Sequence, residues 1–84
     1  MFYVYVLKSR RDGNSYIGST DNLKRRFVEH QKGLVASTKP RRPFELVYYE
    51  AYKVESDAQL REASLKLKSR AYAQLRKRIK QSLT

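Results

Sequence analysis

Short apolar runs near the N-terminus follow the pattern of a β-hairpin. Tyr3–Lys8 is aromatic or β-branched at most positions, as in a strand with much of both faces covered. Arg10–Asn14 interrupts the apolar pattern with turn residues, among them Gly13, which tolerates positive φ. Ser15–Ser19 follows as a second short strand, and Phe44–Tyr52 is the longest strand candidate. The pattern therefore predicts three strands, the first two joined by a tight turn.

A helix is predicted between the second and third strands, from about Asn22 to Lys32. Polar N-cap candidates precede it, and a glycine follows it as the residue that ends it. Leu23 and Phe27 are four residues apart and mark its buried face. Arg26 and His30 are also four apart, and each lies within about 60° of the Leu23 direction. They are therefore expected to flank the buried face.

Two further helices are predicted after the third strand. Ser56–Gln59 resembles a capping box and begins a helix that continues to about Ser69. Its apolar residues lie on two sides, one formed by Ala58 and Leu65 and the other by Leu60, Ala63 and Leu67. A helix that is apolar on two sides is expected to lie between the sheet and another helix, and Ala71–Gln81 is predicted to be that helix.

The elements follow one another in the order β-β-α-β-α-α. This order predicts an α+β fold in which a small three-stranded antiparallel or mixed sheet is flanked by helices. The chain has 84 residues, which gives room for one domain only, and we expect that domain to span residues 1–84. Apolar residues make up 40% of the chain, enough for a modest core despite the high charge.

The charge of the chain is strongly positive. It has 19 Lys or Arg against 8 Asp or Glu, a formal net charge of +11. Beyond Glu62 the sequence holds basic residues and no acidic one, namely Lys66, Lys68, Arg70, Arg76, Lys77, Arg78 and Lys80. An excess of this size indicates a polyanionic partner, with nucleic acid favoured over an acidic membrane surface or an acidic protein.

The composition excludes several kinds of site. The absence of cysteine excludes disulfides, thiolate zinc sites and cysteine nucleophiles, and a single histidine leaves no zinc site of standard composition. Three widely spaced glycines do not make a phosphate-binding loop. No apolar run approaches the ~20 residues of a membrane span, and the N-terminus lacks the basic region of a signal peptide. We therefore expect a cytoplasmic protein without a membrane partner.

Several motifs then occur in a recognisable order. Tyr3-Val4-Tyr5 is followed by Tyr16-Ile17-Gly18, by Arg26 and His30 on the first predicted helix, and by Arg61-Glu62 inside a later one. In this order of motifs the chain resembles the GIY-YIG nuclease superfamily. Among the members of that superfamily, it resembles the short single-domain bacterial proteins most. The second motif matches in full. In the first motif, Tyr3 stands where the family has its name-giving glycine, while the tyrosine of the motif is retained as Tyr5.

The resemblance extends over nearly the whole chain. Lys39–Pro43 leading into Leu46–Glu50, and Ala58–Lys66 in the later helix, are also similar to the short bacterial members. The resemblance implies a DNA endonuclease that hydrolyses phosphodiester bonds with one Mg²⁺ or Mn²⁺ ion held by Glu62. It implies DNA, branched or single-stranded DNA included, as the partner. It also implies a structure-selective or weakly sequence-specific enzyme of DNA repair, recombination or processing.

The residues that carry the resemblance fall into three groups. The candidate catalytic residues are Tyr5, Tyr16, Arg26, His30 and Glu62, with Glu62 also the metal ligand. Gly18 is expected to have a structural role in the site. The candidate nucleic-acid contacts are Lys39, Arg41, Arg42 and Lys66.

The chemistry of these side chains suits phosphodiester hydrolysis. A glutamate offers the hard oxygen that Mg²⁺ prefers, and an arginine offers a planar fork to a phosphate. Either Tyr5 or Tyr16 could accept a proton, provided that a metal or a nearby cation lowers a phenol pKa that is ordinarily near ~10. His30 could orient water or contact phosphate.

Each of these residues also has an ordinary structural interpretation. The tyrosines suit a core, Arg26 could pair with Asn22 or Glu29, and Glu62 could pair with Lys66 at i,i+4. A catalytically idle nucleic-acid-binding module on the same scaffold therefore stays open. The altered first motif favours it, as does the lack of a late asparagine that some superfamily members have. An RNA-binding sheet of the RRM kind ranks last, because no RNP1-type run is present.

Overall fold

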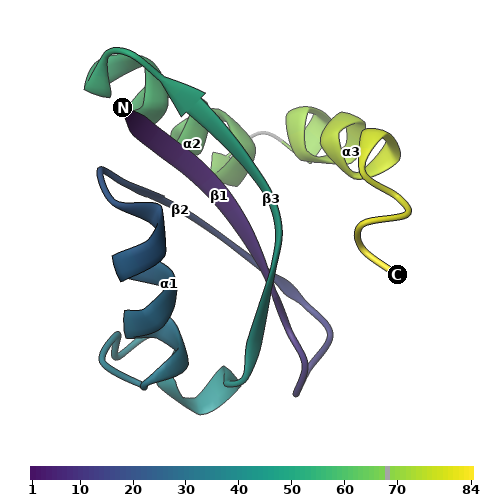
Figure 1. Ribbon diagram of the computed structural model, residues 1–84. Helices are drawn as coiled ribbons and strands as arrows, with labels where there is room; N and C mark the ends of the chain where they lie inside the picture. The colour runs from purple at the N-terminus through teal and green to yellow at the C-terminus, as the bar shows by residue number, and fades with distance from the viewer. Residues whose placement is uncertain (68) are drawn as a thin grey trace.

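A three-stranded antiparallel sheet forms the centre of the molecule (Figure 1), in a computed structural model that describes residues 1–67 and 69–84. The strands are β1 (Phe2–Ser9), β2 (Ser15–Thr20) and β3 (Phe44–Tyr52). They lie in the order β2-β1-β3, so that β1 is central and β2 is an edge. All three predicted strands are confirmed, with β1 and β2 slightly longer than expected.

Helices cover both faces of this sheet (Figure 1). Helix α1 (Leu23–Gln31) packs on one face, whereas α2 (Glu55–Leu67) and α3 (Ser69–Arg78) lie on the other. A short 3₁₀ helix, η1 (Lys39–Arg41), precedes β3. The α+β class and the order β-β-α-β-α-α are thus confirmed. In the described part of the chain, no helix combines the length and apolar character needed to cross a membrane.

The strand register assigns each residue to a face of the sheet. Tyr5 pairs with Gly18 on β2 and with Tyr49 on β3, and these residues share the α1 face. Val4 pairs with Ser19 and with Glu50 on the opposite face. Because side chains alternate along a strand, every candidate residue on β1 and β2 is placed by this pairing.

Each face has its own buried cluster. On the α2 and α3 side the cluster comprises Val4, Val6, Ala58, Leu65, Leu75 and Ile79. On the α1 side it comprises Tyr5, Leu7 and Phe44, with Leu23 and Phe27 of the helix packed against them. The predicted inward face of α1 is therefore correct, and the second cluster is built around a tyrosine.

Two expectations about the later helices are wrong. Helix α2 begins at Glu55, so Ser56 lies inside it and does not act as its N-cap. The side of α2 with Leu60 and Leu67 is not sandwiched, since these residues are 71% and 82% exposed. The reason is that α3 lies beside α2 on the sheet, where its Leu75 joins the cluster on the sheet, instead of covering the outer side of α2.

The helix ends otherwise lie near their expected positions. Asn22 caps α1 by accepting a hydrogen bond from the Arg25 amide at 3.0 Å, and Gly33 follows the helix with a φ of 76°. Helix α3 occupies Ser69–Arg78, where Ala71–Gln81 was expected. The predicted continuation of α2 to Ser69 includes residue 68, which lies outside the described residues.

Candidate active site

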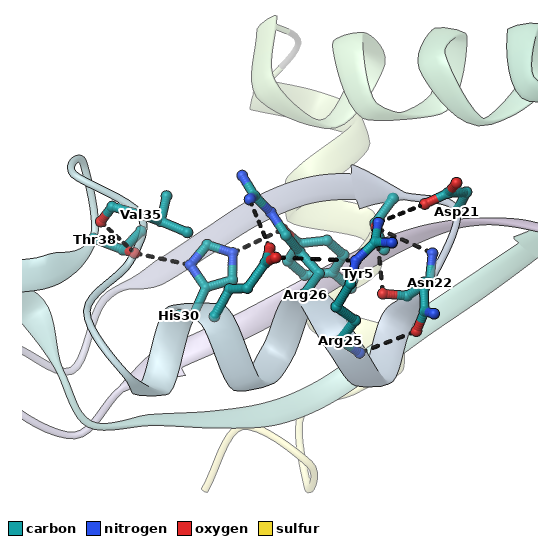
Figure 2. A network of polar contacts seen from close by, with 10 residues as sticks. Tyr5, Asp21, Asn22, Arg25, Arg26, His30, Val35 and Thr38 are labelled. Atoms are coloured by element: carbon teal, nitrogen blue, oxygen red, sulfur yellow. Dashed lines mark hydrogen bonds and ion pairs between the residues drawn. The ribbon is translucent and has the colours of Figure 1, made fainter.

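A chain of hydrogen bonds runs from β1 through α1 into the loop that follows it (Figure 2). The Tyr5 hydroxyl lies 2.8 Å from Nε2 of His30, and Nδ1 of His30 lies 2.8 Å from Oγ1 of Thr38. The Thr38 hydroxyl in turn donates to the Val35 carbonyl at 3.4 Å. Thr38 must therefore accept from Nδ1–H, which leaves Nε2 to accept from the Tyr5 hydroxyl.

Burial sets the protonation states of Tyr5 and His30 in this hydrogen-bonded network. His30 has no solvent exposure and Tyr5 is only 1% exposed. Burial, helped by the charge of Arg26, lowers the pKa of His30, so the imidazole is neutral at neutral pH. Burial raises the pKa of Tyr5 to about 12, although the neighbouring Arg26 guanidinium opposes the rise. At rest the proton lies on Tyr5, with a neutral acceptor already hydrogen-bonded to it.

Gly18 provides the space that the Tyr5 phenol occupies. The two residues are paired across β1 and β2, and the Tyr5 ring extends over the Gly18 backbone. A Cβ built on Gly18 would lie 2.6 Å from Cζ of Tyr5, well inside contact distance. The φ of Gly18 is not positive, so glycine is required here by the space beside Tyr5.

Arg26 and Tyr16 lie next to this phenol. The side chain of Arg26 is 36% exposed and pairs with Glu29, Nη1 to Oε1, at 3.0 Å. This is one of the structural pairings expected for Arg26, and the same guanidinium partly opposes the rise in the pKa of Tyr5 that burial causes. The ring of Tyr16 lies 6.5 Å from the Tyr5 ring and 5.1 Å from the His30 ring, centre to centre.

Glu62 reaches the same region from the opposite face of the sheet. Its Oε1 accepts a 2.7 Å hydrogen bond from Ser19 Oγ on β2, and its Oε2 lies 2.9 Å from Nζ of Lys66. Because β2 is an edge strand, side chains from both faces can meet around it. The ammonium of Lys66 lies 5.9 Å from the Tyr16 ring centre, and the Glu62 charge contributes to the raised pKa of Tyr5.

The carboxylate of Glu62 fits a hard divalent cation. It is 22% exposed, and each oxygen uses one interaction, to Ser19 or to Lys66, so a lone pair remains on each. Among the described residues, no three His, Asp or Glu side chains gather into a group that could hold a metal. A site with Glu62 as its one carboxylate suits Mg²⁺, because this ion commonly takes one or two carboxylates and keeps several waters.

Two of the candidate nucleic-acid contacts that precede β3, Arg41 and Arg42, have structural partners. Arg41 donates to Asp12 from Nε at 2.7 Å and holds the pKa of Asp12 at about 2. Its Nη2 also donates to the backbone oxygen of Asn14. Arg42 donates from Nε to the carbonyl of Lys39 at 2.9 Å, while Lys39 itself is exposed. Arg41 thus joins the loop to the β-hairpin turn.

Arg61, the neighbour of Glu62, fastens α2 to the sheet. Its guanidinium contacts both carboxylate oxygens of Glu50 at 3.0 Å, and Glu50 also accepts from the hydroxyls of Tyr48 and Tyr52. The carboxylate of Glu50 is 15% exposed. This network positions the helix turn that carries Glu62.

Ser19 and Thr38 take part in the site and were not predicted from the sequence. Ser19 could have been found from the strand register, which places it directly after Gly18 on the face of Glu62. No local pattern marks Thr38, which contacts His30 only through the folding of the loop.

Comparison with known proteins identifies the family of this chain. Residues 1–81 match the family described as the GIY-YIG catalytic domain. A UPF0213 protein of Staphylococcus saprophyticus is 39% identical over 69 residues, which cover 81% of this chain and 83% of that protein. A UPF0213 protein of Clostridium perfringens is 42% identical over 67 residues, covering 79% and 71%.

A solved structure is also similar. The solution NMR structure of a UPF0213 protein from Bacillus halodurans has a TM-score of 0.56 and 36% identity, and the match covers 89% of this chain and 82% of that one. The chain belongs to the family of GIY-YIG catalytic domains.

Proposed function

We propose that this protein is a metal-dependent DNA endonuclease that hydrolyses phosphodiester bonds at the edge formed by β2. One observation supports this above the others. A tyrosine bonded to a neutral histidine, an arginine and a glutamate converge from two faces of the sheet around Gly18. Phosphodiester hydrolysis needs a proton acceptor, a cation for the phosphate and an anchor for a metal, and these side chains offer all three.

Tyr5 suits the role of proton acceptor better than Tyr16. Its hydroxyl already donates to His30, so His30 can take that proton while the Tyr5 oxygen accepts one from an attacking water. The pKa of about 12 makes prior ionisation of Tyr5 rare, and relay to a neutral imidazole avoids that cost. His30 acts through Tyr5, since both of its ring nitrogens are already engaged, one by the Tyr5 hydroxyl and the other by Thr38.

Arg26 and Glu62 supply the charges. The half-exposed guanidinium of Arg26 can donate to a nonbridging phosphate oxygen while remaining close to Glu29. Glu62, oriented by Ser19 and Lys66, would hold the divalent ion. When bound, Mg²⁺ or Mn²⁺ offsets negative charge on the phosphate and on the departing oxygen.

The proposed substrate is DNA, recognised through its backbone. Contacts to phosphates position a protein without reading sequence, so cleavage is expected to be structure-selective or weakly sequence-specific. Such an activity suits the processing of branched DNA in repair or recombination.

Replacement of Glu62 tests the proposal. In Glu62→Ala, cleavage should fall at least ~10³-fold, about 4 kcal/mol of transition-state stabilisation, because the metal anchor is lost. DNA affinity should stay level or rise, because a negative charge leaves a DNA-facing surface. Cleavage of flapped, branched and plain duplexes with Mg²⁺, Mn²⁺ or EDTA is measured together with binding.

Glu55→Ala is the matched control, since it removes an exposed glutamate from the first turn of the same helix. Full metal-dependent cleavage by Glu62→Ala would contradict the proposed role of Glu62. A folded wild-type protein that binds DNA but cuts none of the substrates would favour the catalytically idle module.

A further inference from the structure

A cleft of about 520 Å³ opens between the β1–β2 hairpin and helix α3. It lies on the side of the sheet that α2 and α3 cover. The side chains that matter for its chemistry are Lys8, Tyr16, Lys66, Tyr72, Arg76 and Leu83. The C-terminal segment closes one end, where Lys8 Nζ donates to the Leu83 carbonyl at 2.6 Å.

The cleft is cationic and partly aromatic. Of the described residues that line it, three are Lys or Arg and none is acidic. On α3 the guanidinium of Arg76 lies over the Tyr72 ring, 5.5 Å from its centre, and Arg76 is exposed. An arginine plane resting on an aromatic ring offers a stacking surface for a base and a positive charge for a phosphate.

The cleft continues directly into the candidate active site. Tyr16 and Lys66 belong to both, since Lys66 pairs with Glu62 and lies against the Tyr16 ring. A chain of nucleotides in the cleft would therefore lead to the Glu62 end of the site. The cleft has the volume of a small-ligand site, which admits nucleotides of one strand but is far too small for a duplex.

We propose that this cleft binds a single DNA strand beside the scissile phosphate, with a base stacked on Arg76 and phosphates near Arg76 and Lys8. The inference rests on the proposed function and narrows its substrate to DNA with an unpaired strand next to the cleavage point, such as a flap or an overhang. A blunt duplex would leave the cleft empty.

Binding of a labelled single-stranded oligothymidylate in EDTA tests the cleft without requiring cleavage. For Arg76→Ala we expect about a tenfold loss of affinity and a decrease of about 0.7 in the slope of log affinity against log salt, the value for one lost phosphate contact. Arg76→Lys should restore the slope. Lys77→Ala is the matched control, because Lys77 is exposed on the same helix and outside the cleft.

The outcomes separate this inference from the proposed function. The proposed single-strand site is supported, even if no substrate is cut, when Arg76→Ala lowers single-strand affinity but not blunt-duplex affinity. Lys77→Ala should then leave single-strand affinity unchanged. Equal losses in Arg76→Ala and Lys77→Ala, or equal losses for single strand and blunt duplex, would overturn it even if cleavage is robust. Thermal unfolding of each variant verifies that the fold is retained.

Discussion

At the scale of single residues, His30 is the most informative position. It is fully buried, and both of its ring nitrogens are occupied by hydroxyl partners, one on β1 and one in the loop after α1. A polar side chain in this position is stable only when every hydrogen-bonding atom has a partner. The same arrangement that satisfies the imidazole holds the Tyr5 phenol over Gly18, so packing and proposed chemistry share the same contacts.

The buried imidazole predicts a specific dependence of stability on pH. The pKa of His30 is lowered in the folded state from 6.5, so the unfolded chain binds the proton more readily. The neutral, buried His30 therefore contributes fully to the free energy of unfolding above about pH 6.5. This contribution is lost as the pH falls from there through the lower folded pKa, and the free energy of unfolding then changes by at most ~1.4 kcal/mol per pH unit. Urea unfolding between about pH 7.5 and 5 measures this slope.

His30→Gln is the comparison, because glutamine does not titrate and should lack this part of the slope. The carboxylates titrate in a different window: the pKa of Glu50 is lowered from 4.5 and that of Asp12 to about 2. Their contributions are lost only at more acidic pH. A wild-type free energy of unfolding that stays flat down to about pH 5 would contradict a neutral buried His30.

At the scale of elements, the attachment of α2 to the sheet decides where Glu62 lies. The carboxylate of Glu50 on β3 receives the bidentate guanidinium of Arg61 and two tyrosine hydroxyls. The outer side of α2 contributes nothing to this attachment, since Leu60 and Leu67 are exposed. The helix is therefore held by contacts on its inner side, where Arg61 pairs with Glu50 and Glu62 accepts a hydrogen bond from Ser19.

Removal of the Arg61 charge should loosen this attachment. In Arg61→Met we expect the free energy of unfolding to fall by about 1.5–3 kcal/mol, the range for hydrogen bonds to charged groups, because Glu50 loses its cation while its carboxylate remains largely buried. Urea denaturation provides the measurement. Arg70→Met, at an exposed position on α3, should change stability by less than about 0.5 kcal/mol. Equal effects of the two variants would mean that the Glu50 network does not hold the helix.

At the scale of the whole molecule, the net charge of +11 dominates encounters with other molecules. Part of this charge is internally engaged, as with Arg41 and Asp12, but the exposed Arg70, Arg78 and Lys80 lie outside the cleft. Such a surface attracts polyanions by releasing their counterions, irrespective of sequence.

Affinity for duplex DNA should accordingly depend strongly on salt. We expect log affinity to fall by about 0.9 per neutralised phosphate for each tenfold increase in salt. Titrations of a labelled duplex at several salt concentrations, in EDTA to prevent cleavage, measure the slope. A flat response would argue for an acidic protein partner or for no polyanionic partner.

The sequence by itself determined the strands, the approximate helices and the family. Local periodicity specifies which residues enter a strand or helix, and the motif order from Tyr5 to Glu62 specifies the scaffold. Only the tertiary structure decided that Glu62 arrives around the β2 edge and that Thr38 orients His30. It also decided that the outer side of α2 stays exposed. These features depend on contacts between segments distant in the chain, and no local pattern records how a helix is placed on a sheet.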